Sequence, residues 1–375
     1  MLFSCKKENV INSNSTICSF QKNIGGSSDD LSNSIVIKGD FIYVLGHSNS
    51  FGDVNGDHYL IKLDLEGNII FEKTYGGNLA EEGVRIIETS DGNFILLGIT
   101  ESYGSGNKDI HVIKIDCNGV VIWEKYFGGL ADDTPSDIIE TKNSEFCISA
   151  TTESFGAGAR DIYLMWIDQS GNLVRERTFG GIENDGSSNL IEIENNQIML
   201  YGYTRNFGAN SRDLYLMKVS SIGDSLRAKR YGGSGYEESQ GFVRTSKGGF
   251  LINGHSSSTD PNHNMYALEI DSNGNIIWEN NYGGALHDGG QAVLINNEGN
   301  YVLLGRSMSF GNGNSDMYLV VTNPNGELIS EEIIGGYKND IGLDIIEYKS
   351  FYFIIGYSDS FGSGDNDAYI VKLKK

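Results

Sequence analysis

The sequence predicts an all-β protein, a β-propeller of seven blades with four antiparallel strands in each blade. Three observations predict this fold. Gly-Gly pairs recur at a nearly fixed period, each period holds four short apolar runs separated by turn residues, and the two ends of the chain supply parts of one unit. The pairs begin at residues Gly25, Gly76, Gly128, Gly180, Gly232, Gly283 and Gly335.

The unit from Gly76 to Gly129 shows the four predicted strands, which we name A to D. Their ranges are Val84–Thr89, Phe94–Thr100, Ile110–Asp116 and Val120–Tyr126. Strand B begins with four apolar residues in a row, as expected for a strand that is covered on both faces. Four antiparallel strands per repeat, in sheets that pack face to face, make up a propeller blade. No stretch of the chain shows a helical period.

The two ends of the chain predict how the propeller closes. The last unit stops after its strand C, Ala368–Leu373, and a lone strand D, Ile17–Ile24, precedes the first Gly-Gly pair. The N-terminal strand is therefore expected to complete the last blade and close the ring, which removes exposed sheet edges. Residues 17–375 form the predicted propeller, and residues 1–16 form a flexible tether.

Composition limits the classes of partner. The formal net charge is -22 and the pI is near 4.6, so the surface repels nucleic acid and anionic lipid. No apolar run approaches the roughly 20 residues of a membrane helix. The four cysteines form no CxxC pair, which argues against a zinc cage. Cys18, Cys117 and Cys147 fall in different repeats and are expected to be free thiols, and the protein is expected to be a monomer.

The first residues resemble a bacterial lipoprotein signal. Leu2–Cys5 is similar to the end of such a signal, where the cysteine is lipidated, and Lys6–Asn9 is similar to the residues after that cysteine in lipoproteins of the Bacteroidetes group. A basic region and most of an apolar region are not among the residues before Cys5. The resemblance implies lipidation at Cys5 on the bacterial cell envelope, as an outer membrane lipoprotein, or secretion. The alternative is an ordinary polar tail.

The folded part resembles bacterial β-propeller repeat proteins of uncharacterised function. The matching segments are Gly248–Phe250, Ser154–Gly158, Asp161–Leu164 and Asn275–Trp278. The resemblance covers residues 17–375 and implies a secreted or surface-attached scaffold. It implies little about activity, because one fold hosts many functions.

Other propeller families fit less well. Kelch repeats carry a Gly doublet after the second strand, where this chain has a single glycine such as Gly98. Quinone-binding propellers carry an Asp-Gly-Trp docking pattern, which Asp116, Gly119 and Trp123 resemble. The tryptophan position is occupied around the ring by Phe20, Phe71, Trp123, Arg175, Arg227, Trp278 and Ser330. Two tryptophans in seven blades do not support a quinone cofactor. The sialidase Asp-box is one residue shorter than Asp271–Gly274.

Two sets of repeated polar residues lie at the end of each blade that carries the B–C and D–A loops. The first set stands four residues after each second glycine and consists of Asp30, Glu81, Asp133, Asp185, Glu237, Asp288 and Asp340. The second set precedes strand C and consists of Asp57, Asp109, Asp161, Asp213, Asn264, Asp316 and Asp367. The first set is predicted to bind a ligand at the channel mouth, through a cation or sugar hydroxyls, and paired acids also suit glycoside cleavage. The alternative is that these residues accept hydrogen bonds from glycine N–H groups and fix turns.

A third repeated position holds an aromatic residue. Its members are Phe51, Tyr103, Phe155, Phe207, Phe310 and Phe361. These rings are expected to be wedges between blades.

The fifth blade departs most from the repeat. It has Ser258 in place of the aromatic residue and Asn264 in place of the aspartate, with His263 between them. We therefore add Tyr236, His263 and His287 to the predicted binding residues. The alternative is neutral drift.

No metal ligand and no catalytic residue can be assigned from the sequence. The histidines lack metal-ligand spacing, and no cofactor is expected. Calcium is the one alternative, because Asp53–Asp57 with Asp64 at the twelfth place resembles a calcium loop, although His58 stands where glycine is expected.

The sequence favours non-catalytic binding of a protein or glycan on the face that carries the B–C and D–A loops. The near-perfect symmetry among the acids favours binding over catalysis. The alternatives are a polysaccharide-acting hydrolase or lyase that uses acids at the channel mouth, and a purely structural surface element.

Overall fold

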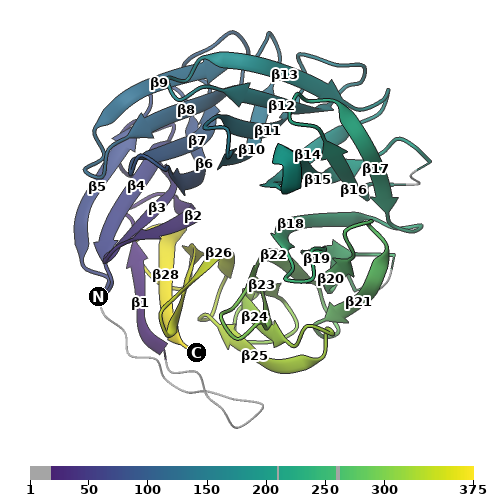
Figure 1. Ribbon diagram of the computed structural model, residues 1–375. Coiled ribbons are helices and arrows are strands. Elements are labelled where there is room, and N and C mark those ends of the chain that lie inside the picture. Colours follow the sequence, from purple (N-terminus) through teal and green to yellow (C-terminus); the bar gives the residue numbers. More distant parts are fainter. Residues whose placement is uncertain (1–17, 209–210, 259–261) are drawn as a thin grey trace. The chain divides into compact units, whose positions relative to one another are not determined.

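The chain is a seven-bladed β-propeller with four antiparallel strands in each blade (Figure 1). The computed structural model describes residues 18–208, 211–258 and 262–375. In this part of the chain the one helical element is the 3-10 turn η1 (Glu194–Asn196). None of it is a helix with the length and hydropathy needed to cross a membrane. The predicted fold class is confirmed.

The strands recur in a fixed order within each unit. The seven strands A are β2 (Asp30–Lys38), β6 (Glu81–Glu88), β10 (Asp133–Glu140), β14 (Asp185–Glu192), β18 (Glu237–Arg244), β22 (Asp288–Ile295) and β26 (Asp340–Tyr348). The seven strands B are β3 (Phe41–Ser48), β7 (Phe94–Thr100), β11 (Phe146–Thr152), β15 (Ile198–Thr204), β19 (Phe250–Ser256), β23 (Tyr301–Ser307) and β27 (Phe351–Ser358). The seven strands C are β4 (Asp57–Asp64), β8 (Asp109–Ile115), β12 (Asp161–Ile167), β16 (Asp213–Val219), β20 (Met265–Ile270), β24 (Asp316–Thr322) and β28 (Asp367–Lys374). The seven strands D are β5 (Ile69–Tyr75), β9 (Val121–Phe127), β13 (Leu173–Phe179), β17 (Ser225–Tyr231), β21 (Ile276–Tyr282), β25 (Leu328–Ile334) and β1 (Cys18–Ile24).

The N-terminal strand completes the last blade, as predicted. Blades one to six each take four consecutive strands, and blade seven has the strand order β26, β27, β28, β1. Strand β1 pairs antiparallel with β28, from Cys18 opposite Leu373 to Ile24 opposite Ala368. The two ends of the chain are thus tied together by one sheet.

Strand A begins earlier than the sequence predicts. Strand β6 starts at Glu81 and not at Val84, because the backbone of Glu81 already pairs with Thr100. The register then shifts between Gly83 and Arg85, which is a β-bulge. A polar start followed by a bulge hides the alternation of side chains by which strands are recognised.

Strands B and C form the buried part of each blade. All seven residues of β8 and β12 are buried, while β9 and β13 expose their first two residues. The chain divides into two compact units, residues 18–54, 59–74 and 240–375 in the first and residues 55–58 and 75–239 in the second. Each unit has its own apolar clusters of buried side chains.

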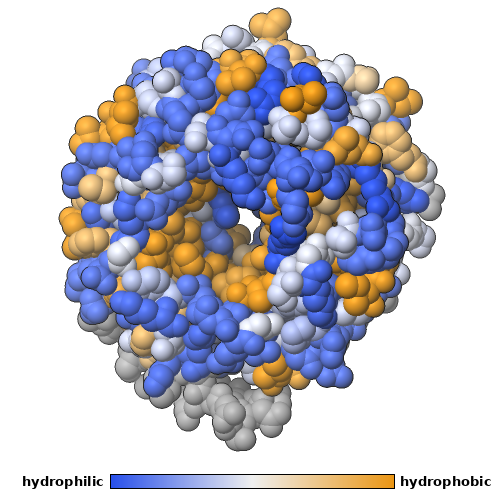
Figure 2. All heavy atoms as spheres, in the orientation of Figure 1, coloured by the Kyte–Doolittle hydropathy of each residue, from blue (hydrophilic) through white to orange (hydrophobic). Residues whose placement is uncertain are grey.

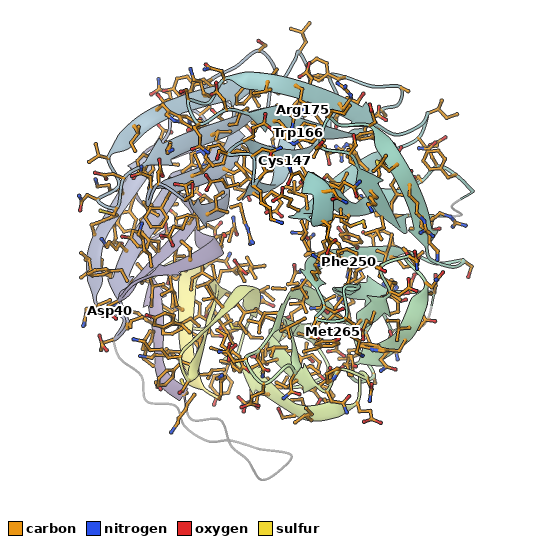
Figure 3. All side chains as sticks on the ribbon, in the orientation of Figure 1. Asp40, Cys147, Trp166, Arg175, Phe250 and Met265 are labelled. Atoms are coloured by element: carbon orange, nitrogen blue, oxygen red, sulfur yellow. The ribbon has the colours of Figure 1, made fainter. Side chains whose placement is uncertain are left out.

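One cross-strand row in blade three explains an arginine at the docking-tryptophan position (Figure 3). Arg175 lies opposite Trp166, and Trp166 lies opposite Cys147. The guanidinium carbon is 4.4 Å from the centre of the Trp166 ring. Two of its nitrogens donate to the Glu145 carboxylate at 2.9 and 2.7 Å. Arg175 therefore has a packing role in the second unit.

The cysteines differ in state. Cys117 is an exposed free thiol, and Cys147 is a buried free thiol whose pKa is raised by burial. Cys18 is disulfide-bonded, so the expectation of a free thiol is wrong for this residue. The predicted lipidation site Cys5 lies outside the described residues.

The repeated aromatic residues pack within their own blades. Phe310 lies 5.7 Å from Tyr318 of strand C in the same blade, measured between ring centres, and Phe155 lies 5.4 Å from Tyr163 in the same way. The equivalent pairs are Phe51 with Tyr59, Tyr103 with His111, Phe207 with Tyr215 and Phe361 with Tyr369. Phe310 and Phe361 also pack against apolar clusters that contain residues of two neighbouring blades, so these two rings have the expected role as wedges and cover strand C as well.

Candidate functional site

The predicted acid ring lies inside the turns. All seven acids are the first residues of strands A, and at most 2% of each is exposed; they are Asp30, Glu81, Asp133, Asp185, Glu237, Asp288 and Asp340. Asp288 shows the pattern: its carboxylate accepts hydrogen bonds from the Gly284 N–H at 2.7 Å and the Ser309 hydroxyl at 2.7 Å, and also from Ser307. A carboxylate that is buried and accepts several hydrogen bonds stabilises the turn.

The second set of polar residues is buried against the Gly-Gly pair. Asp109 accepts hydrogen bonds from the N–H groups of Ser105 and Gly106 at 2.8 and 2.9 Å. Its other oxygen faces Gly128, where an added Cβ would lie 1.9 Å from it. Only glycine fits this position, because two acids approach it: Asp109 from one side and Asp133 from the other. This contact explains why the Gly-Gly period is so regular.

Burial changes how these acids titrate. Burial raises the pKa of Asp316 to about 6, and the nearby charge of Asp340 adds to the rise. The pKa of Asp109, Asp185 and Asp367 is raised as well, with burial as the main cause in each case. These pKa shifts result from burial of the carboxylates in the turns, and they do not indicate an exposed catalytic carboxylate. We therefore remove the seven acids from the candidate binding site and with them the acid pair expected for glycoside cleavage.

The calcium-loop interpretation also fails on geometry. Asp57 and Asp64 are the two ends of strand β4, which has eight residues. An extended strand of this length spans roughly 23 Å at about 3.3 Å per residue, so one ion cannot contact both ends. The Asp64 carboxylate instead accepts hydrogen bonds from the backbone N–H and the side-chain amide of Asn68, both at 2.8 Å.

Three positions of the repeat meet at the end of each blade. The first is the next-to-last residue of strand B, and the second is the residue directly before Asn264 or the aspartate at its place. The third is the residue directly before the acid that begins strand A of the following blade. In blade four they are Tyr203, Arg212 and Tyr236. The Arg212 guanidinium carbon lies 3.8 Å from the centre of the Tyr203 ring and 5.4 Å from that of Tyr236. Arg212 also donates to the Tyr236 hydroxyl at 3.0 Å. We call these three places the loop triad.

Tyr236, one of the predicted binding residues, is already engaged inside the second unit. Its hydroxyl donates to Glu238 and accepts from Arg212. Burial, followed by the hydrogen bond to Glu238, raises the pKa of Tyr236 to about 12. This residue is part of a packed stack in blade four.

In blade five the loop triad consists of three histidines of the first unit. His255 is the next-to-last residue of β19, His263 lies between β19 and β20, and His287 directly precedes β22. One ring nitrogen from each lies within 4.8 Å of the other two, and all three residues are half-buried. The ring centres are 5.4 to 6.2 Å apart. Such a set of imidazoles has the donor chemistry of a transition-metal site.

The surroundings of the histidine triad leave space on one side. Gly289 faces it: an added Cβ would lie 3.8 Å from His255 Nδ1, 3.8 Å from His287 Cε1 and 3.9 Å from Arg306 Nε. Burial lowers the pKa of His287, and the charges of Arg306 and His263 lower it further. The imidazole of His287 is therefore biased toward its neutral form.

The sequence named His263 and His287 as site residues but missed His255. The three residues are 8 and 24 positions apart in the chain, which matches no local metal motif. The signal that was available is the repeat itself, since all three members of one loop triad are histidine. The other close histidine pair, His58 and His111, differs because each is 1% exposed and their rings are hydrogen-bonded to each other at 2.9 Å.

A second feature of the loops is exposed apolar side chains. Five of the seven D–A loops carry one, namely Leu79 (50% exposed), Leu130 (87%), Ile182 (81%), Leu286 (56%) and Tyr337 (82%). Figure 2 shows apolar groups at the surface among mostly hydrophilic residues. An apolar side chain that is more than 80% exposed buries little surface in the fold and is accessible for contact with a partner.

Comparisons with known proteins support the fold and nothing more specific. No protein-family model matches the sequence, and no curated protein matches it. The WD40 domain of Pan2 from Neurospora crassa is similar in structure, with a TM-score of 0.56, 12% identity and coverage of 91% of this chain and 88% of that one. A puromycin-hydrolyzing peptidase from Mycobacterium tuberculosis has a TM-score of 0.56 and 12% identity over 92% of this chain and 51% of its own length.

A puromycin hydrolase mutant complexed with PGG gives a TM-score of 0.60 at 12% identity, over 93% of this chain and 52% of that chain. This chain thus spans about half the length of the two hydrolases. The neighbours come from several sources, so the propeller is established, and membership in a bacterial repeat family stays a prediction.

Proposed function

We propose that this protein is a non-catalytic binding scaffold that engages a protein partner through its D–A loops. The observation that carries the proposal is the exposed apolar residue at the tip of five D–A loops. β-Propellers commonly bind protein partners, although one fold hosts many functions. A glycan ligand and a catalytic role on polysaccharide are the alternatives.

The loops that present these residues are held in place. In blade three, Asp133 accepts hydrogen bonds from the Gly129 N–H and the Ser154 hydroxyl, both at 2.7 Å, and the Ala131 N–H donates to Ser154 at 3.0 Å. Leu130 stands between Gly129 and Ala131. A fixed loop loses little entropy on binding, and this favours an apolar anchor at its tip.

The catalytic alternative lacks a specific observation. The acids that suggested it are buried in turns. Two structural neighbours carry the names of hydrolases, but this chain spans about half of each. We therefore give the enzyme interpretation no residues.

A paired substitution tests the proposal. Peptides displayed on phage are selected on the immobilised wild-type chain, and the selected peptides are then measured against Leu130→Ser combined with Ile182→Ser. We expect binding to fall more than about tenfold while the free energy of unfolding changes by less than about 1 kcal/mol, as for exposed sites. Ile222→Ser is the matched control, because Ile222 is 61% exposed in a C–D turn of the same unit.

Two outcomes would count against it. Selection could yield no peptide that distinguishes the double variant from the control. A glycan array could instead give a ligand whose binding the double variant leaves unchanged, and this would move the function to sugar recognition.

We propose in addition that the chain is held on a bacterial envelope through a lipid on the Cys5 thiol. Because Cys117 and Cys147 are free thiols, this lipid and a disulfide of Cys18 within one chain exclude each other, and we propose that the lipid prevails in the exported protein. The support is the resemblance of Leu2–Cys5 to a lipoprotein signal. Cys5→Ala in the full precursor is expected to release the protein from the membrane fraction. Membrane retention of the variant would contradict the anchor.

A further inference from the structure

We propose that His255, His263 and His287 bind a divalent transition-metal ion, with zinc as the first candidate. The site adjoins one of the apolar loop tips, because His287 directly follows Leu286, but it rests on different side chains from the proposed partner binding. It is carried by the convergence of three ring nitrogens within 4.8 Å of one another. All three histidines belong to the first compact unit.

The repeat holds the three histidines in place. The carbonyl of His263 accepts a hydrogen bond from the Asp288 N–H at 3.3 Å, and the carbonyl of His287 accepts one from the Met308 N–H at 3.0 Å. His255 lies in β19 opposite Met265 of β20. The equivalent carbonyl bonds occur in other blades, for example from Asp185 to Arg160 and from Glu153 to Asp132. The backbone positions are therefore set by the fold, as a binding site requires.

The distances suit a small cation. In tetrahedral zinc coordination with Zn–N near 2.0–2.1 Å, the ligand nitrogens are about 3.3 Å apart. A zinc site here therefore requires the three nitrogens to approach one another by at most about 1.5 Å. Neutral imidazole is a preferred ligand of zinc, copper and nickel, whereas calcium and magnesium prefer oxygen.

The placement of histidines is selective. The protein has six histidines, and three of them occupy one loop triad. In the same unit, blade six has Arg306, Ser315 and Asn339 at these places, so the repeat itself does not require histidine. His263 also has a backbone φ of 58°, in the left-handed region that non-glycine residues rarely adopt. Strained backbone of this kind clusters at functional sites.

The open side of the triad provides room for a fourth ligand. Gly289 leaves the space between His255, His287 and Arg306 free of a side chain. The Arg306 Nε is buried and, among the described residues, has no hydrogen-bond partner. A metal-bound hydroxide or carboxylate could accept a hydrogen bond from it and offset its charge. Three histidines with a fourth open position match the pattern of accessible zinc sites.

Substitutions already present in other blades provide a clean test. Asn366 occupies the His263 place in blade seven and Asn339 occupies the His287 place in blade six, both in this unit, so His263→Asn and His287→Asn are expected to fold. His47→Ala is the matched control, because His47 holds the His255 place in blade one, with no histidine at the other two places. All proteins are full-length and stripped of metal before measurement.

Calorimetric titration with Zn²⁺ gives the first readout. We expect one Zn²⁺ per wild-type chain, binding weakened more than about tenfold in each asparagine variant, and no change in His47→Ala. Mg²⁺ and Ca²⁺ are expected not to compete. Zinc binding of unchanged affinity in both asparagine variants would overturn the proposal, since it would place the ion on the acidic surface.

A Co²⁺ spectrum gives a second readout that does not depend on affinity alone. We expect wild type to show the strong visible bands of four-coordinate cobalt and His263→Asn to lose them. Thermal unfolding without metal is measured on each variant, so that loss of folding is not mistaken for loss of a ligand. Bands that survive in His263→Asn would contradict the assignment.

Discussion

Blades five and six share the same strands but differ at the turn that leads into strand C. In blade six, Asp316 accepts hydrogen bonds from the N–H groups of Asn312 and Gly313, both at 3.1 Å, and Phe310 covers Tyr318. In blade five the residues at the aspartate and aromatic places are Asn264 and Ser258. Strand β20 begins one residue later than its equivalents, at Met265.

This difference distinguishes residues that build the fold from residues that are candidates for binding a ligand. Blade six keeps every residue that builds the turn, and its loop triad contains no group of metal ligands. Blade five has lost the aromatic cover and the aspartate, and its triad is His255, His263 and His287. A position that is the same in every blade serves the fold, whereas a cluster found in one blade is a candidate for a specific ligand.

The largest predicted effect is on the first glycine of the pair in blade six. A Cβ at Gly335 would lie 1.9 Å from Asp316 Oδ1 and 2.8 Å from Asp340 Oδ2. Because both acids are buried and fixed, Gly335→Ala is expected to lower the free energy of unfolding by about 3 kcal/mol or more. Urea unfolding followed by circular dichroism measures it.

Gly299→Ala in the same blade is the control for backbone strain. Gly299 has a φ of 84° with no atom within 4 Å of an added Cβ. Its replacement is expected to cost about 1–2 kcal/mol, from the left-handed backbone alone. Equal losses in the two variants would mean that the acid pair does not build the turn.

The next effect concerns pH. Because the pKa of Asp316 is raised to about 6 from 3.8, the folded protein binds this proton more readily than the unfolded chain. Stability is therefore expected to rise as pH falls from 7 toward 4 and to lose this contribution again as pH increases through 6. One pKa unit corresponds to about 1.4 kcal/mol, so this residue contributes at most about 3 kcal/mol, and solvent screening reduces this to about 2 kcal/mol.

Asp316→Asn copies the residue that blade five already carries. The variant is expected to flatten the dependence of urea midpoints on pH between about 4.5 and 7.5. The remaining slope comes from the other acids with raised pKa, such as Asp340 and Asp367. A slope that is the same in variant and wild type would show that Asp316 is not among the groups responsible.

A smaller effect is expected from the aromatic cover. Phe310 is half-buried against Tyr318 and a core cluster, so Phe310→Ala should cost about 1–2 kcal/mol, less than a fully buried phenylalanine. Met308→Ala, in the same loop and 44% exposed, is expected to change stability by less than about 0.5 kcal/mol. Thermal unfolding compares the two, and equal losses would deny Phe310 a packing role.

The repeat made much of the fold predictable. Strand B of the second unit, Phe94–Thr100, has the predicted bounds, and strands C and D are displaced by one residue. Apolar runs and turn residues at a fixed period are local signals. The pairing of β1 with β28 was predictable because the last unit has no strand D of its own, and the N-terminal segment is a strand D that precedes the first complete unit.

The site was less predictable, for two physical reasons. Acidic residues near a channel mouth suggest a binding surface. Their burial and their hydrogen bonds to Gly-Gly N–H groups are tertiary properties, which the amino-acid sequence alone does not reveal. The histidine triad brings together residues from a strand and two loops, so no spacing between its members along the sequence indicates a metal site. Tyr236 was predicted as a binding residue because it also departs from the repeat, yet its hydroxyl accepts a hydrogen bond from Arg212.

The most direct test of this account is an anomalous difference map of zinc-soaked crystals, recorded at the zinc absorption edge. We predict one strong peak between the ring nitrogens of His255, His263 and His287, and none at the turns that hold Asp316 and its equivalents. Peaks confined to carboxylates, or no peak at the triad, would contradict the claim that specific binding resides where blade five departs from the repeat.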